Sequence, residues 1–238
     1  MPERKTLLTV GGVALMIEGV AYLLITITGG LIGVTPGDDP RWLQAITTQP
    51  ALSLITYGVL TGVADLVLIP GALALYLAFR KNHGAVMLVA AAVLLSYVAI
   101  DVSTFVSTST AITLLAQGYA ATTDQAQRAA FLAAEYYGLS TIPLSQFLGW
   151  FYPSMGYVIV SCVMLREGVH GAAPYLGVAA GVVDIIASFS FLFPGTALEL
   201  LMSPGLALLG LFALFAGLAL VRMARSTAIE ANVEEASG

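Results

Sequence analysis

Four acidic residues lie inside long apolar stretches of the chain, where a charged side chain is costly. They are Glu18, Asp65, Asp101 and Asp184, one in each of four stretches and far from the stretch ends. An ionised acid at the centre of a membrane helix costs roughly 2.5 to 3.5 kcal/mol, and neutralising an aspartate at pH 7 costs about 4 kcal/mol. Acids in such a setting bind a cation, carry protons or accept hydrogen bonds. The four are therefore candidate ion- or substrate-binding residues.

Each acid shares a helical face with hydroxyl-bearing residues, because residues three, four and seven apart lie on one side of a helix. These further candidates are Tyr22, Tyr57, Thr61, Tyr97, Thr104 and Ser188. The third apolar stretch carries Ser and Thr well beyond one stripe, so we expect it to line a polar path. Helical rise places the four acids at ~14 to ~25 Å from the inner ends of their stretches. Both a ladder of acids across the membrane and a compact cluster fit these depths.

The composition excludes a soluble protein. Of 238 residues, 58% are hydrophobic and only 10% are charged, whereas a soluble domain carries about 25% charged residues. Mean hydropathy is +0.91, which makes the lipid bilayer the expected partner. The net charge of −5, without a long block of like charges, argues against a nucleic-acid partner. The single cysteine, Cys162, excludes an intrachain disulfide.

Six apolar stretches are long enough to cross a bilayer, which takes about 20 helical residues. They cover residues 7–34, 50–79, 84–115, 143–165, 175–193 and 203–223. The third connection is polar and predicts an interfacial helix over 123–137, opened by a capping box of Thr122 and Gln125. Residues 224–238 form a polar tail.

The basic residues predict the orientation of these six spans. Seven of the nine Lys and Arg residues fall on one side, and only Arg41 and Arg128 on the other. The positive-inside rule then places both termini in the cytoplasm. We expect one all-α, multi-pass domain over residues 1–238 in the plasma (cytoplasmic) membrane. The oligomeric state is not indicated.

An octapeptide recurs in the second and fifth predicted spans. Residues 58–65 read GVLTGVAD and residues 177–184 read GVAAGVVD, with five identities in eight. Because these spans run in opposite directions, the match is compatible with two inverted halves of three helices each, as in many secondary transporters. Chance resemblance is the alternative, since Gly, Val and Ala are abundant in this chain. The spacing of the two glycines in each copy also predicts close helix packing.

No residues indicate a known enzymatic chemistry. His83 and His170 fall in short loops on the predicted cytoplasmic side, where they could hold haem or a metal, but two solvated loop histidines are the simpler interpretation. Motifs of hydrolases, nucleotide-binding proteins and thiol enzymes are lacking. The sequence therefore identifies no cofactor.

Two segments, residues 72–84 and 156–181, carry a recurring pattern of a Leu-Tyr pair before an Arg and a Gly-Tyr pair before an Arg, then Pro and Leu-Gly. The residues that form it are Leu75, Tyr76, Arg80, Gly156, Tyr157, Arg166, Pro174, Leu176 and Gly177. In this pattern the chain resembles a family of prokaryotic six-span membrane proteins catalogued as a domain of unknown function. The resemblance implies six helices and a prokaryotic origin, and it implies no activity.

Three functions are compatible with the sequence. The favoured one is a carrier or pore for a proton or a monovalent or divalent cation, linked to a small solute, with Asp65 and Asp184 as paired site residues and Glu18 and Asp101 beside them. The second is a non-catalytic membrane module that binds a partner helix or an apolar ligand. The third is an intramembrane lipid enzyme whose acids hold magnesium or manganese, the metals that prefer oxygen ligands.

Overall fold

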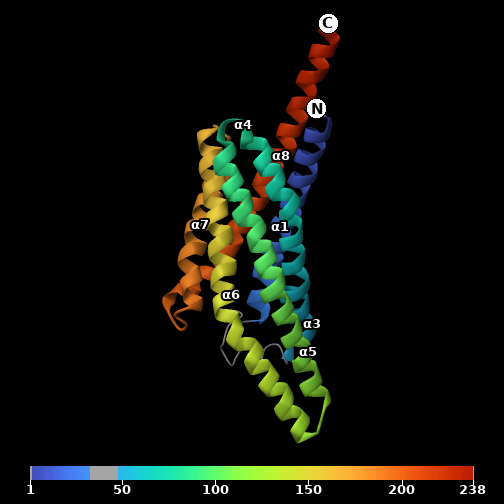
Figure 1. Cartoon of the computed structure of the whole chain (residues 1–238), viewed down its shortest axis with the longest axis vertical. Helices are drawn as coiled ribbons and strands as arrows, with labels where there is room; N and C mark the ends of the chain where they lie inside the picture. The colour runs from blue at the N-terminus through green and yellow to red at the C-terminus, as the bar shows by residue number, and fades with distance from the viewer. Residues whose placement is uncertain (1, 33–47, 238) are drawn as a thin grey trace.

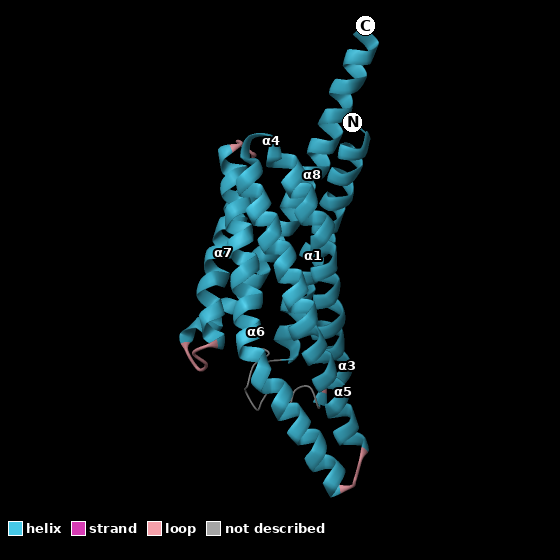
Figure 2. Ribbon diagram, viewed as in Figure 1, coloured by secondary structure: helices cyan, strands magenta, loops and turns pink. Residues whose placement is uncertain are grey.

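The computed structural model describes residues 2–32 and 48–237, and all regular structure within these residues is helical (Figure 2). Five helical segments are long and apolar enough to cross a membrane. Four of them correspond to α1 (Pro2–Ile32), α6 (Gln125–Arg166), α7 (Ala173–Ser188) and α8 (Met202–Ser237). The fifth runs from Pro50 to Ala121. This composition of apolar helices is that of an integral membrane protein.

The segment from Pro50 to Ala121 folds back on itself. In chain order its five parts are α3 (Pro50–Ser53), the π-helix η1 (Leu54–Leu60), α4 (Thr61–Asp101), the π-helix η2 (Val102–Val106) and α5 (Ser107–Ala121). Inside α4, His83 leaves helical geometry with φ −130° and ψ 33°. At this point the ribbon reverses, and two limbs lie side by side (Figure 1). The predicted spans 50–79 and 84–115 correspond to these two limbs.

The reversal at His83 is held by an acid from another part of the chain. Glu167, just after α6, accepts a hydrogen bond from Asn82 at 3.1 Å and pairs with Nε2 of His83 at 2.9 Å. Residues 80–82 are helical in the structure, so the predicted loop shrinks to the one non-helical residue. His83, interpreted from the sequence as a solvated loop residue, is partly exposed and also pairs with Glu167.

The helices form a closed ring in which each packs on its neighbours. α1 lies against α8 and α4, α4 lies against α6, and α7 lies between α6 and α8. The chain termini lie at the same end of the bundle (Figure 1). Large apolar side chains point outward along the helices, among them Val10, Leu66 and Leu88, which are 50 to 59% exposed. Acids inside and apolar residues outside are the distribution that a lipid environment selects.

The predicted interfacial helix 123–137 and the predicted span 143–165 are a single helix, α6. Its N-cap is Asp124, whose Oδ1 accepts from the backbone N–H groups of Ala126 and Gln127. The predicted capping box is therefore wrong. The Thr122 hydroxyl donates instead to the side chain of Gln127 at 2.8 Å. Packing against α5 supports the continuous helix, since Phe131 covers the backbone at Gly118.

Other predicted boundaries shift by a few residues. α8 continues to Ser237, so the predicted polar tail 224–238 is largely helical. α7 ends at Ser188 and is followed by two 3₁₀ turns, η3 (Phe189–Phe191) and η4 (Ala197–Leu201), because the Pro194-Gly195 pair ends the helical run. The last two residues of the predicted span 7–34, and Arg41, lie outside the described residues.

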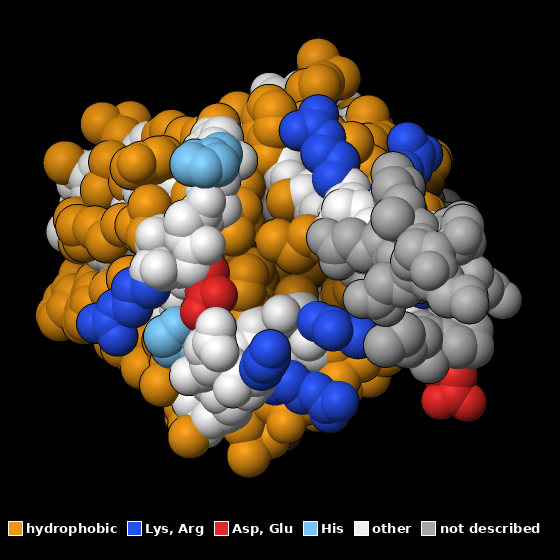
Figure 3. Space-filling model, turned by 90° about the horizontal axis from the view of Figure 1, so that it is seen from above, with side chains coloured by type: hydrophobic (Ala, Val, Ile, Leu, Met, Phe, Trp, Pro, Cys, Tyr) orange, Lys and Arg blue, Asp and Glu red, His pale blue; other side chains and the backbone are white. Residues whose placement is uncertain are grey.

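Basic side chains gather at one end of the bundle. Figure 3 views the end where the termini lie, and Lys and Arg are prominent there. Helix α1 begins with Arg4 and Lys5, α4 reverses just after Arg80 and Lys81, and α6 ends at Arg166. By contrast, Arg128 lies near the start of α6 at the other end, where it contacts the ring of Tyr119.

Helices α1 and α8 approach closely through glycines spaced seven residues apart. Gly12 faces Gly217, and Gly19 faces Gly210. A methyl group at Gly19 would meet the carbonyl oxygen of Gly210 at 2.5 Å, which is closer than a Cβ can lie to backbone. Small residues at membrane helix contacts allow such backbone approach.

We expect Gly19→Ala to destabilise the protein by about 1 to 3 kcal/mol, because the added methyl must push two backbones apart. Gly84→Ala is the matched control, since nothing lies within 4 Å of a Cβ there. Thermal unfolding of the two variants in detergent measures the difference. Equal midpoints for both would contradict the close α1–α8 contact.

Candidate functional site

A tyrosine on α6 binds the acid on α1. The hydroxyl of Tyr157 donates to Oε1 of Glu18 at 2.7 Å, and both side chains are fully buried. These residues are 139 positions apart in the chain. The second oxygen of Glu18, Oε2, is buried without a hydrogen-bond partner among the described residues.

A second tyrosine binds the acid on the first limb of α4. The hydroxyl of Tyr97, on the returning limb, donates to Oδ1 of Asp65 at 2.7 Å. The hydroxyl of Tyr22, on α1, lies 3.5 Å from that of Tyr97. Tyr22, Asp65 and Tyr97 are each at most 5% exposed. A chain of hydroxyls therefore links α1 with both limbs of α4.

Asp65 and Asp101 lie within hydrogen-bonding reach of each other. A hydrogen bond between two carboxyl groups requires a proton on one of them. Oδ2 of Asp65 accepts no hydrogen bond from a hydroxyl or amide of the described residues. The pair is therefore a place where the bundle can hold one proton. The predicted pairing of Asp65 with Asp184 is not the one in the structure.

The same-helix hydroxyl partners predicted for the acids bind elsewhere. Thr61 donates to the carbonyl of Thr56 at 3.0 Å, Thr104 to that of Ile100 at 2.6 Å, and Ser188 to that of Ile185 at 2.7 Å. Tyr57 packs edge-on against Phe105, with ring centroids 6.4 Å apart. Helical Ser and Thr side chains readily bond to the preceding turn of their own helix. Glu18 and Asp65 accept from tyrosines of other helical segments instead.

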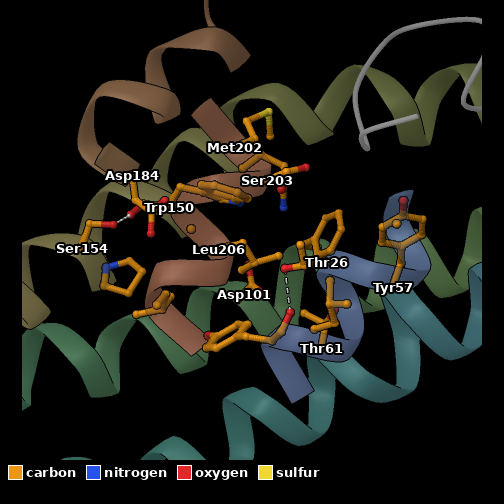
Figure 4. Close-up of a pocket in the computed structure, with 18 of the residues that line it drawn as sticks. Thr26, Tyr57, Thr61, Asp101, Trp150, Ser154, Asp184, Met202, Ser203 and Leu206 are labelled. Atoms are coloured by element: carbon orange, nitrogen blue, oxygen red, sulfur yellow. Dashed lines mark hydrogen bonds between the residues drawn. The ribbon is translucent and has the colours of Figure 1, made fainter. Parts of the chain in front are cut away.

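A cavity of about 350 Å³ lies between the helices, and its lining comes from α1, η1, α4, η2, α6, α7 and α8 (Figure 4). Two acids, Asp101 and Asp184, contribute to this lining. Aromatic residues form much of the remaining wall, namely Tyr22, Tyr57, Tyr97, Phe105 and Trp150. The returning limb of α4 contributes only Tyr97 and Asp101, so the Ser and Thr residues predicted to line a path along it do not line this cavity.

The two acids of the cavity each lie against a glycine of a neighbouring helix. A Cβ at Gly149 would meet Oδ1 of Asp101 at 2.7 Å, and a Cβ at Gly205 would collide with Oδ1 of Asp184. Asp184 is 2% exposed, and its Oδ1 has no hydrogen-bond partner among the described residues. The glycines let helices α6 and α8 close around the carboxyl groups without covering them with a side chain.

Both π-helices of the described residues contribute to the cavity. Tyr57 belongs to η1 and Phe105 to η2, and the two rings pack edge-on against each other. A π-helical turn inserts an extra residue and changes which side chains face inward, and such turns are frequent at functional sites. Hydroxyl groups support the widened turns, because Thr61 and Ser107 each donate to the carbonyl five residues earlier.

The two copies of the recurring octapeptide have different surroundings. Gly177 and Gly181 pack tightly on α6, as predicted, with Ser161 and Val158 against them. A Cβ at Gly62 would instead reach its nearest neighbour, Val106, only at 3.6 Å. Asp65 ends the first copy in the tyrosine network, whereas Asp184 ends the second copy in the cavity wall.

Within the described part of the chain, no group of three or more His, Cys, Asp or Glu side chains is placed to hold a metal ion. His83 is bound to Glu167, and His170 is exposed in the loop before α7. The described residues therefore give no support to a haem or metal site formed by the two histidines.

Sequence reasoning missed several residues of this site. Tyr157 carries the only hydrogen bond to Glu18 in the described residues, yet its one sequence signal was the Gly-Tyr pair of the family resemblance. Trp150 and Gln146 line the cavity from α6, a helix that carries none of the four candidate acids. Cross-helix partners of this kind depend on packing that spacing along one helix does not reveal.

Comparison of the chain with protein-family models, with curated proteins and with solved structures finds no match. The resemblance to a six-span family of unknown function thus stays a prediction.

We expect Tyr157→Phe to lower the free energy of unfolding by about 1.5 to 3 kcal/mol, because it leaves a second buried oxygen of Glu18 without a donor. Tyr175→Phe is the control, since Tyr175 is 68% exposed. Thermal unfolding in detergent compares them. A Tyr157→Phe variant as stable as the control would show that the hydrogen bond to Glu18 contributes nothing.

Proposed function

We propose that the chain crosses the cytoplasmic membrane six times with both termini inside. Five apolar helical segments support this topology, one of which reverses at His83 and so supplies two crossings. The basic residues at the end that holds the termini favour a cytoplasmic location for that end. The recurring octapeptide and the closed ring of helices are compatible with two inverted halves.

Cysteine labelling tests this topology in a Cys162→Ser background. Thr123 and His170 are exposed and lie at opposite ends of α6. We expect Thr123→Cys to react with a membrane-impermeant maleimide in intact cells, and His170→Cys to react only after permeabilisation. Labelling of both from one side would contradict a crossing by α6, and the reverse pattern would contradict the orientation.

We also propose that the protein is a carrier that couples the movement of a small solute to a proton. This proposal rests on the observation that Asp101 is part of both the cavity wall and the buried network of side chains. It lines the cavity, and it lies within hydrogen-bonding reach of Asp65 in the buried network. The charge on the cavity wall therefore depends on where the network holds its proton.

Coupling follows from this shared residue. In a buried site of low polarity, electrostatic energies between charged groups are several times larger than in water. A solute bound in the cavity therefore favours one protonation state of the Asp65–Asp101 pair. In turn, the protonation state of the pair changes the affinity of the cavity for the solute. Tyr97 and Tyr22 extend the network with hydroxyls that both donate and accept, as a proton path requires.

The two other functions have less support from the geometry. A metal-dependent lipid enzyme needs a group of ligands that the described residues do not form. A purely structural role for the acids needs them dispersed and fully hydrogen-bonded. Instead Asp65 and Asp101 converge, and three of the four candidate acids each keep a buried oxygen without a hydroxyl or amide donor in the described residues.

Proteoliposomes that contain a pH-sensitive dye test the carrier. Cationic, neutral and anionic small solutes are added in turn under a proton gradient, and we expect one class to cause proton movement. Asp65→Asn and Asp101→Asn should lower this movement at least about tenfold, since an amide cannot exchange the proton.

Glu135→Gln is the control for this assay, because Glu135 is a buried acid on α6 that does not line the cavity. It should move protons like the wild type. Proton movement with no class of solute, or unchanged movement in both aspartate variants, would overturn the carrier.

A further inference from the structure

We infer that the cavity binds a small organic cation, an amine or quaternary ammonium that carries an apolar group. The inference rests on the proposed carrier for its role in transport, and it names the solute by the chemistry of the wall. Three features of that wall lead to it, namely its charge, its aromatic surface and its size.

The charge of the cavity wall is negative only. Asp101 and Asp184 lie in the lining, and its described residues include no Lys, Arg or His. Asp184 is almost fully buried, and its Oδ1 has no partner in the described part of the chain. The hydroxyl of Ser154 does not supply one, because it donates to the carbonyl of Trp150. A buried carboxylate without a partner is best satisfied by a ligand that brings a positive charge.

The aromatic surface favours an organic cation over an inorganic one. Tyr22, Tyr97, Phe105 and Trp150 line the same space as the two acids. Ring faces attract ammonium groups, and aromatic walls are how proteins recognise quaternary ammonium ligands. A hard metal ion prefers six or more oxygen ligands, and the described residues form no such group.

The volume sets the size of the ligand. At about 350 Å³ the cavity is far larger than a metal ion needs and lies at the small end of ligand pockets, which span about 300 to 1,000 Å³. Two separate acids give the wall two anchor points. Asp184 serves as the counter-ion of the ligand. The charge of the ligand also acts on Asp101, and through Asp101 it affects the protonation of Asp65. Entry of one monocation is balanced by departure of the one proton that the Asp65–Asp101 pair holds, so the net charge of the cavity is unchanged.

Equilibrium binding to the purified full-length protein in detergent tests the inference without transport. The probes share a phenyl group and differ in charge, namely benzyltrimethylammonium, benzyl alcohol and benzoate. We expect saturable binding of the cation alone, measured by calorimetry. Asp184→Asn should weaken it at least about tenfold, because it removes the counter-ion, and Glu135→Gln should leave it unchanged.

A second pair of variants keeps the test valid if Asp184→Asn does not fold. Trp150→Leu removes the ring and should weaken binding of the cation several-fold, whereas Trp150→Phe keeps a ring and should weaken it less. Equal affinity for the cation and the neutral probe, no binding of the cation, or equal affinities of the Leu and Phe variants would overturn the inference.

The binding experiment and the proteoliposome experiment can refute the cation site and the carrier separately. Saturable binding of benzyltrimethylammonium without solute-linked proton movement keeps the cation site and refutes the carrier. Proton-linked movement of a neutral or anionic solute, without binding of the cation, keeps the carrier and refutes the cation site.

Discussion

The constraint on which this structure depends is the cost of placing a carboxyl group inside an apolar bundle. The fold meets that cost with tyrosines contributed by other helices. Tyr157 on α6 binds Glu18 on α1, and Tyr97 on the returning limb of α4 binds Asp65 on the first limb. Each of these hydrogen bonds joins segments distant in the chain, so the polar groups that are costly in lipid also specify which helices are neighbours. Packing between apolar helices in lipid is far less selective, because lipid tails are as apolar as the side chains they would replace.

Glycines and π-helical turns determine where space remains between the helices. The pairs Gly12–Gly217 and Gly19–Gly210 draw α1 and α8 into backbone contact. By contrast, Gly149 and Gly205 face the two acids of the cavity lining rather than backbone. The π-helix η1 ends beside Thr61 and η2 begins beside Asp101, so the change of register occurs next to residues that line the cavity. The same residue type thus brings two backbones together at one interface and makes room for carboxyl groups at another.

Much of the architecture follows from composition, and less of the site does. Hydropathy is sufficient to predict the apolar helices, because a segment that crosses a bilayer must make its backbone hydrogen bonds within the protein, as a helix does. The boundaries of the helices were less predictable. Helix α6 continues through Gly138 and Pro143, where a break was predicted. The reversal of α4 involves only His83, which Glu167 binds. The acids were found because ionisable residues are rare in apolar stretches. Their partners were not, because spacing along one helix pointed to Thr61, Thr104 and Ser188, whose hydroxyls are taken by their own backbone.

The two copies of the recurring octapeptide show how far local sequence determines a role. Both end in an aspartate at the same distance from two glycines, yet Asp65 accepts a hydrogen bond from Tyr97 while Asp184 keeps a buried oxygen without a partner in the described residues. The difference arises from the facing helix, which offers a tyrosine hydroxyl to one acid and the bare backbone of Gly205 to the other. An acid with a fixed donor is suited to hold a proton within the bundle. An acid without one is available to a ligand, and Asp101, which contacts Asp65 and also lines the cavity, connects the two.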